Sequence, residues 1–450
     1  MPSSTLENIE QCLWHPCTQM KFHEQQAPLK IIRAQGPYLE TADGKQIIDA
    51  ISSWWCKSLG HGHPKLRQAL VQQTEQFEHI MLANLTHQHI TDLSAKLSRL
   101  LPGLNKVFYA SDGSMAVEIA MKMSLHAHQL QGEFKRTRFM ALANGYHGET
   151  ILSLSVSDVG RFKAAYSALL LPCEFIQNLP YVSGKHDPLW HDCSAEWTNI
   201  EAQLNARADE LTALICEPIL QGAAGMLIYS KDLLRRLRAW CTAHNVHLIA
   251  DEIMTGFGRT GLGLASAHAD ITPDFVCLGK GLTAGWLPLS AVLTSEPIYR
   301  LFYDADIGKA FLHSNTFAGN PLAAAVANAA LAIYETERTY QQVQNQEALL
   351  YQLMREVMAV TQRLHNIRQI GAVVAADLIM DSPTAPTGRE VFEQALALGA
   401  LLRPLGNTLY WLPPLNTEPA VLKRLQEITI SAIERAVWLK SAKTSAVNPA

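Results

Sequence analysis

The sequence of 450 residues has no run of about 20 apolar residues, no cluster of basic residues and no C-x-x-C pair. Without such a run, no segment is expected to cross a membrane as a helix. The formal net charge is −4 and the pI is about 6.5, so neither nucleic acid nor an anionic membrane is expected as a partner. The eight cysteines lack the spacing of a disulfide framework, and no signal peptide is recognisable, which together indicate a reducing cytoplasm.

Metal-ligand spacing is also lacking. The 17 histidines include His61-Gly62-His63 and His87-Gln88-His89, but no Cys, Asp or Glu accompanies either pair at ligand spacing. We therefore expect turn and surface roles for these histidines, and no metal.

Two apolar runs each end on a charged side chain. Residues 246–250 lead into Asp251, and residues 275–279 lead into Lys280. Each run predicts a short buried strand, and ligands of an open parallel sheet bind beyond the carboxyl ends of its strands. An amine and a carboxylate facing one crevice suit pyridoxal phosphate, because Lys280 can form the Schiff base and Asp251 can pair with the pyridinium N–H. Taken alone, Lys280 could equally be a surface residue and Asp251 a turn residue or helix cap.

Helical and strand-like patterns alternate from Pro64 onward, which predicts an α/β fold. A hairpin over residues 31–51 precedes them, turning at Asp43-Gly44. The length of 450 residues suggests about three domains or, equally, two large lobes. We expect an N-terminal arm and hairpin over residues 1–62, a large domain over 63–336 and the rest of a small domain over 337–450. Strands are expected at 106–109, 138–142, 211–216, 289–294, 367–370, 373–379 and 408–412, and helices at 64–78, 115–131, 231–244, 321–334, 341–361 and 389–398. Residues 172–198 lack periodicity and predict a long surface excursion.

Two further features indicate a ligand site. Ser111-Asp112-Gly113-Ser114 links a strand to a helix start, where backbone N–H groups can hold phosphate, although a plain Asp or Ser cap explains the same residues. Tyr146 follows the strand at 138–142 and could stack on a cofactor ring or simply be a loop tyrosine.

Two tryptophans and one arginine could likewise have either a ligand-binding or a purely structural role. Trp54 and Trp55 cannot share one face of a strand, so one of them could face a cavity, although two core aromatics would be commoner. Arg403 lies between apolar residues and could bind a substrate carboxylate or form an internal salt bridge.

Residues 256–261 match G-x-G-x-x-G, which is typical of dinucleotide-binding proteins. That motif requires a helix directly after it, and residues 263–273 hold several helix breakers instead. We therefore reject a nicotinamide-dependent dehydrogenase and expect a loop that passes near the substrate.

Two motifs in the sequence resemble those of a known family. DEIMTGFGRTG at 251–261 and GKGLTAG at 279–285 are similar to the motifs of class III pyridoxal-phosphate-dependent aminotransferases, and the resemblance covers nearly the whole chain. It implies the aspartate-aminotransferase-like fold, PLP fold type I, in which a large mostly parallel sheet domain is joined to a smaller α+β domain. It also implies a homodimer with active sites at the interface.

The resemblance assigns roles at matching positions. Lys280 would be the Schiff-base lysine and proton shuttle, and Asp251 would pair with the ring nitrogen of pyridoxal 5′-phosphate. Tyr146 would stack on the cofactor and belong to the catalytic and substrate-binding groups. Gly113 and Ser114 would hold the phosphate together with Asn315 and Thr316, which in this fold usually come from the partner subunit. The substrate site would be lined by Cys17, Trp54, Ser314 and Arg403.

Four features resemble one branch of the class, the aminotransferases that act on 8-amino-7-oxononanoate with S-adenosylmethionine in biotin biosynthesis. They are WHP at 14–16, SSWW at 52–55, NGYHG at 144–148, and LRPLG at 402–406 with LPP at 412–414. Arg403 would then bind the oxononanoate carboxylate. Cys17 stands where some members have Tyr, Ser314-Asn315 replaces Gly-Pro, and Glu149 replaces an Asp, so the amino donor stays open. The alternatives are a class III ω-amino-acid or diamine aminotransferase and a non-catalytic relative.

Overall fold

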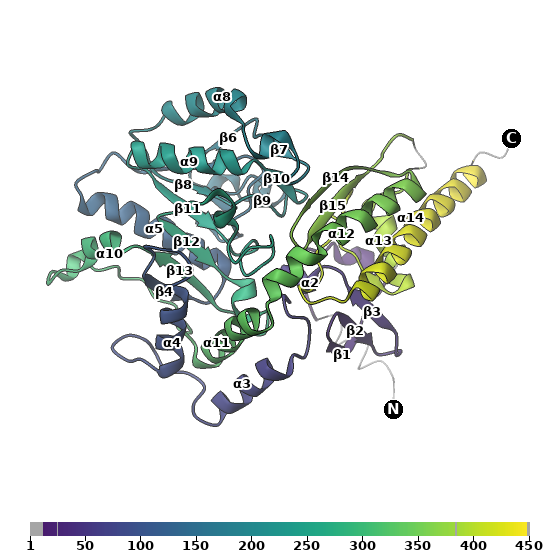
Figure 1. The fold of residues 1–450 in the computed structure, drawn as a ribbon, viewed down its shortest axis with the longest axis horizontal. Coiled ribbons are helices and arrows are strands. Elements are labelled where there is room, and N and C mark those ends of the chain that lie inside the picture. The colour runs from purple at the N-terminus through teal and green to yellow at the C-terminus, as the bar shows by residue number, and fades with distance from the viewer. Residues whose placement is uncertain (1–11, 25, 383–384, 448–450) are drawn as a thin grey trace.

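A computed structural model describes residues 12–24, 26–382 and 385–447. Residues 1–11 of the expected N-terminal arm, and residue 25, lie outside the described residues. The described part of the chain forms two lobes, joined through helices α11 (Pro321–Thr336) and α12 (Thr339–Thr361) near the middle of Figure 1.

The large lobe is built on a seven-stranded sheet with the order β4-β13-β12-β11-β8-β5-β6. Its strands are β4 (Lys106–Ala110), β5 (Arg138–Leu142), β6 (Cys173–Ile176), β8 (Leu211–Cys216), β11 (His247–Asp251), β12 (Phe275–Leu278) and β13 (Ser290–Thr294). Only β13 runs antiparallel to its neighbours within this sheet. The predicted mostly parallel sheet is therefore confirmed.

The central strands are continuously apolar because both faces of the sheet are covered. Along β11, Ile249 packs with helix α5 (Gly113–Leu130) on one face, whereas Leu248 and Ala250 pack on the other face. Helix α9 (Lys231–Ala243) and α11 cover that second face. Burial on both faces leaves the strand ends as the place where polar side chains can gather.

The small lobe is built from segments near both ends of the chain (Figure 1). One sheet has the order β1-β2-β3-β16, and a second has the order β14-β15-β17. The strands are β1 (Ile31–Gln35), β2 (Tyr38–Thr41), β3 (Gln46–Asp49), β14 (Leu364–Ile370), β15 (Val373–Leu378), β16 (Ala400–Leu401) and β17 (Thr408–Trp411). They pack with α12, α13 (Gly388–Leu398) and α14 (Pro419–Val447). The α/β, fold-type-I architecture is confirmed, while the boundaries at residues 62/63 and 336/337 stay a prediction.

Shorter helices complete the described chain: α2 (Ser52–Trp55), α3 (Pro64–Thr74), α4 (Gln88–Leu97), α6 (Ile151–Ser155), α7 (Gly160–Lys163), α8 (Ser194–Asn205) and α10 (Glu296–Phe302). Within the described ranges, no helix is both long and apolar enough to traverse a bilayer.

The expected surface excursion over residues 172–198 is wrong. Residues Cys173–Ile176 form β6, which pairs in parallel with β5 at the edge of the large sheet. Residues Tyr181–Val182 form β7 in a small sheet with β9 (Leu220–Gln221) and β10 (Leu227–Tyr229), and Trp190 is buried. An edge strand of four residues is too short to show periodicity in sequence, which explains the error.

Candidate active site

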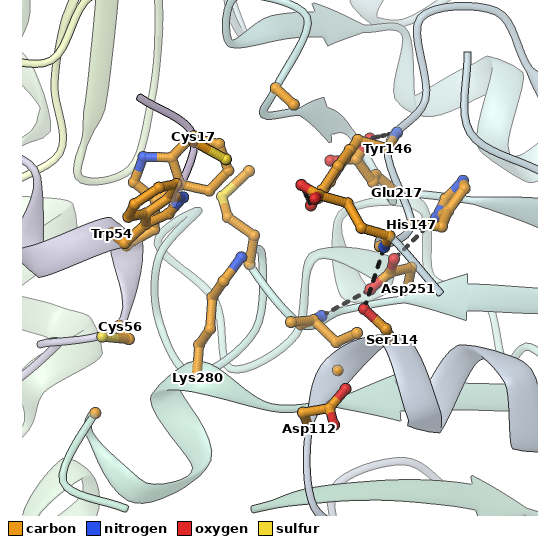
Figure 2. A pocket seen from close by; sticks show the side chains of 18 of the residues that line it. Cys17, Trp54, Cys56, Asp112, Ser114, Tyr146, His147, Glu217, Asp251 and Lys280 are labelled. Atoms are coloured by element: carbon orange, nitrogen blue, oxygen red, sulfur yellow. Dashed lines mark hydrogen bonds and ion pairs between the residues drawn. The ribbon is translucent and has the colours of Figure 1, made fainter. Parts of the chain in front are cut away.

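A cavity of about 1090 Å³ opens at the carboxyl ends of the large-sheet strands and extends to residues 403–406 of the small lobe. Eight of the predicted site residues line it: Cys17, Trp54, Gly113, Ser114, Tyr146, Asp251, Lys280 and Arg403. In Figure 2, Trp54 and Cys17 lie on the left of the cavity, Tyr146, His147 and Glu217 on the right, and Lys280 between them. The prediction that Asp251 and Lys280 face one crevice is therefore confirmed.

Asp251 ends β11 inside the cavity wall with its side chain almost fully buried. Its Oδ2 lies 2.8 Å from Nδ1 of His147, and its Oδ1 accepts the backbone N–H of Ile253 at 3.1 Å. Because a carboxylate only accepts, Nδ1 of His147 carries the hydrogen. Sequence reasoning missed His147, although it lies next to the predicted Tyr146.

Lys280 follows β12 and Gly279, and its φ of 40° is in the left-handed region. Burial lowers the pKa of its ammonium below the ordinary lysine value. Its Nζ lies 4.9 Å from the ring centroid of Trp55. A lysine held this way is a better nucleophile and base than a solvated one, because more of it is neutral at a given pH.

Glu217 is a second residue that the sequence reasoning missed. It follows β8, the neighbour of β11, so a third strand end also delivers a carboxyl group to the cavity. Burial raises its pKa to about 7. Its two oxygens accept the backbone N–H groups of Tyr146 and Gly222, each at 2.9 Å. Glu217 thus fixes the loop that carries Tyr146.

Tyr146 is half-buried at the cavity wall. Its hydroxyl donates to Oε1 of Glu149 at 2.9 Å. Burial, reinforced by Glu149, raises the pKa of this phenol far above its ordinary value. The ring therefore remains a neutral, flat surface at the edge of the cavity.

The loop between β4 and α5 presents a helix start to the cavity. Asp112 is the N-cap, and its Oδ1 accepts the N–H of Met115 at 3.1 Å, so the predicted helix cap is confirmed. The cap leaves the first N–H groups, those of Gly113 and Ser114, without a helical acceptor, so they are available to an anion in the cavity. A Cβ on Gly148 would lie 2.2 Å from Oγ of Ser114, so the facing loop requires glycine at this position.

Trp54 and Arg403 face each other at the side of the cavity that the small lobe forms. The guanidinium carbon of Arg403 lies 3.7 Å from the ring centroid of Trp54. Both tryptophans line the cavity, but Trp54 is 44% exposed, whereas Trp55 is only 7% exposed and is buried in the wall beside Lys280. The structure records no ion pair for Arg403 among the described residues, so its guanidinium is available to a ligand carboxylate.

Two segments that the sequence analysis assigned to the site or its surroundings do not line this cavity. Ser314, Asn315 and Thr316 precede α11 beside the exposed Leu312 and Phe317, and none of the three lines the cavity of its own chain. The Gly256–Gly261 loop also does not line the cavity, so the prediction that it passes near the substrate is wrong. Its Phe257 and Arg259 are buried instead, because the loop packs under the small lobe. Only a short 3-10 helix, Ala265–Ala269, follows it, which confirms that the loop is not a dinucleotide motif.

These residues fit an anionic aromatic cofactor that carries an aldehyde. The buried carboxylate of Asp251 suits a protonated ring nitrogen, the amine of Lys280 suits the aldehyde, and the N–H groups at the start of α5 suit a phosphate. The structure thus contains each of the three groups that pyridoxal phosphate needs.

Comparison with known proteins agrees with this geometry. The family described as aminotransferase class III matches residues 20–433. The chain is 40% identical over 407 residues to the adenosylmethionine-8-amino-7-oxononanoate aminotransferase of Helicobacter pylori, covering 89% of this chain and 91% of the relative. The crystal structure of the Methanocaldococcus jannaschii protein of the same name is similar with a TM-score of 0.88 at 32% identity, covering 97% of this chain and 100% of that chain. A PLP-bound amine transaminase from an uncultivated Pseudomonas species is similar with a TM-score of 0.86 at 29% identity, covering 94% and 98%.

Proposed function

The chain belongs to the class III aminotransferases, and we propose that it transfers an amino group to 8-amino-7-oxononanoate, giving 7,8-diaminononanoate for biotin biosynthesis. We propose S-adenosylmethionine as the donor, because the relatives carry adenosylmethionine in their names. The observation that carries the proposal is that Lys280 and Asp251, each at the end of a buried strand, line one cavity. Arg403 lines the same cavity and has no carboxylate partner among the described residues.

The cofactor is pyridoxal 5′-phosphate, as in the class and in the PLP-bound neighbour. When bound, it supplies an electron sink for the electron pair left on the substrate carbon. Asp251 would hold the ring nitrogen with a negative charge that His147 stabilises. Gly113 and Ser114 would hold the phosphate through backbone N–H groups, and Tyr146 would lie along the ring.

Lys280 would move the proton. Burial favours its neutral amine, so Nζ can accept the proton that leaves the α-carbon of the amino donor. Trp55 and Met254 line the cavity wall that this amine shares. Lys280 is therefore the base of the reaction and the holder of the transferred proton.

Substrate recognition would fall to the small-lobe side of the cavity. Arg403 presents a planar guanidinium, which binds a carboxylate through two parallel N–H bonds. Its stacking on Trp54 fixes the plane of that fork. Cys17 lines the cavity from the N-terminal arm, where it offers a small apolar contact rather than an aromatic one.

A homodimer would complete the site. Ser314, Asn315 and Thr316 lie outside the cavity of their own chain on a segment with exposed Leu312 and Phe317. We propose that Asn315 and Thr316 bind the phosphate of the partner subunit's site and that Ser314 lies near its substrate. The domain division at residues 62/63 and 336/337, and a cytoplasmic location, belong to the same proposal.

The first experiment is the absorption spectrum of the purified protein reconstituted with pyridoxal phosphate. We expect a visible band that S-adenosylmethionine alone bleaches, and 7,8-diaminononanoate when 8-amino-7-oxononanoate is then added. Lys280→Ala should abolish turnover, because it removes both the amine and the base. Bleaching by lysine or a diamine alone would instead identify another class III aminotransferase, and substantial turnover by Lys280→Ala would refute the assignment.

A further inference from the structure

The segment Ser52–Trp55, labelled α2, is a left-handed turn made without glycine. Its four residues have φ values of 49°, 44°, 73° and 71°. L-residues avoid this region because Cβ approaches the following carbonyl oxygen, and they visit it as single residues rather than as runs. Four in succession persist only where the surroundings determine them, which occurs most often at functional sites.

Asp49, the last residue of β3, holds the middle of this turn. Its Oδ1 accepts the backbone N–H of Ser53 at 2.9 Å, and its Oδ2 accepts the Ser53 hydroxyl at 2.7 Å. His61 Nε2 lies 2.9 Å from the same Oδ2. Burial alone would raise the pKa of this fully buried carboxyl, but the hydrogen bonds from His61 and Ser53 hold it below its ordinary value. Asp49 is therefore an anion tied to the turn by two bonds.

Other groups fix the two ends of the turn rather than its middle. The Ser52 hydroxyl donates to the carbonyl oxygen of Leu412 at 2.8 Å, and Arg259 from the Gly256–Gly261 loop lies 3.5 Å from that hydroxyl. The Trp55 indole N–H donates to the hydroxyl of Tyr410 at 3.0 Å. Trp54 points into the cavity between these fixed ends, and Arg403 is the group it stacks against.

We propose that Asp49 is a positioning residue that holds the turn Ser52–Trp55 left-handed and thereby keeps the Trp54 ring against the guanidinium of Arg403. The inference rests on the proposed function, because it takes Arg403 as the group that binds the substrate carboxylate. A guanidinium stacked on an aromatic face keeps its edge N–H groups free for a bidentate carboxylate. If the turn relaxes, the Trp54 ring moves away from Arg403 and no longer holds the guanidinium in one plane. Lys280 and Asp251 stay in place.

The test is a double-mutant cycle with Asp49→Ala, Trp54→Ala and the double variant, measured on the cofactor-loaded enzyme. We expect each single substitution to raise the KM for 8-amino-7-oxononanoate about tenfold and to change kcat less than about twofold. The double variant should have a KM no higher than the worse single variant, because both remove the same contact. Multiplicative effects on KM, or a fall in kcat with unchanged KM, would overturn the proposal.

Asp232→Ala is the matched control. Asp232 is also buried and accepts hydrogen bonds, from Cys193 N–H at 3.2 Å and from Arg236 at 2.7 Å, but it lies on α9 and does not line the cavity. Its KM should equal that of the wild type even if its thermal midpoint falls. If Asp49→Ala does not fold, Asp49→Asn takes its place in the cycle under the same criteria.

A crystal structure of the Asp49 variant separates this inference from the proposed function. We expect residues 52–55 to leave the left-handed region and Trp54 to leave Arg403. If the wild type fails to convert 8-amino-7-oxononanoate, the proposed function is wrong, and the crystal structure alone decides the role of Asp49. An unchanged turn, with Trp54 still stacked on Arg403, would overturn the inference whatever the substrate.

Discussion

Nδ1 of His147 lies 2.8 Å from Oδ2 of Asp251, and both side chains are almost completely buried at the wall of the cavity. The pair joins the loop after β5 to the end of β11. Within the described residues, Nε2 of His147 is buried without a hydrogen-bond partner, so the imidazole directs its one strong bond to Asp251. His147 therefore stabilises the negative charge of Asp251, which we propose pairs with the cofactor.

Replacing His147 by Phe should lower kcat at least about tenfold. The ring volume is retained, but a hydrogen bond to a buried charge, worth about 1.5–3 kcal/mol, is lost. Steady-state kinetics at saturating pyridoxal phosphate will measure the effect. His191→Phe is the matched control, because His191 lies on the exposed surface and outside the cavity. An unchanged kcat for His147→Phe would show that Asp251 does not depend on this partner.

Replacing Arg403 by Lys should raise the KM for the oxononanoate substrate about tenfold or more, with a smaller change in kcat. Lysine keeps the positive charge but cannot form two parallel bonds to a carboxylate or stack on Trp54 as a plane. Arg424→Lys, at an exposed ion pair with Glu427 on α14, should leave KM unchanged. Equal KM values for the two variants would mean that the substrate carboxylate binds elsewhere.

Replacing Gly148 by Ala should weaken the binding of pyridoxal phosphate at least about tenfold. Gly148 has φ of +121°, and an added Cβ would lie 2.2 Å from Oγ of Ser114 and 2.8 Å from Oγ of Ser153, so the loop and the start of α5 would have to move apart. The dissociation constant is measured by titrating the apoprotein with the cofactor. Gly160→Ala, where a Cβ would meet no atom within 4 Å, is the control and should bind the cofactor normally.

Stability should fall in acid because of His247, whose pKa is lowered to about 4 by burial and then by the neighbouring His128. The unfolded chain binds a proton near pH 6.5 and the folded chain only near pH 4, so stability is complete above pH 6.5 and is lost as the pH falls through this window. The full loss is roughly 3 kcal/mol. Urea unfolding at pH 7 and pH 4.5 should show a smaller difference for His247→Asn than for the wild type. Equal differences would contradict the assignment.

Much of the fold was predictable because its driving patterns are local. Residues 246–250 and 275–279 are short apolar runs that end on a charge, and they became β11 and β12 with Asp251 and Lys280 at one cavity. The edge strand β6 was not predictable, because four residues with a single neighbouring strand show no periodicity. The Gly256–Gly261 loop was correctly rejected as a dinucleotide motif, but its packing under the small lobe depends on contacts with residues more than 100 positions away.

The sequence by itself determined most strands of the large sheet, the amine and carboxylate at its edge, the helix start after β4 and the family, because each depends on residues close together in the chain. Tertiary structure decided the rest. Glu217 and His147 gain their roles only when three strand ends and a loop converge at one cavity wall, where burial changes the cost of charge. The left-handed turn at Ser52–Trp55 is likewise unfavourable locally, and only bonds from Asp49, Leu412 and Tyr410 make it the stable conformation.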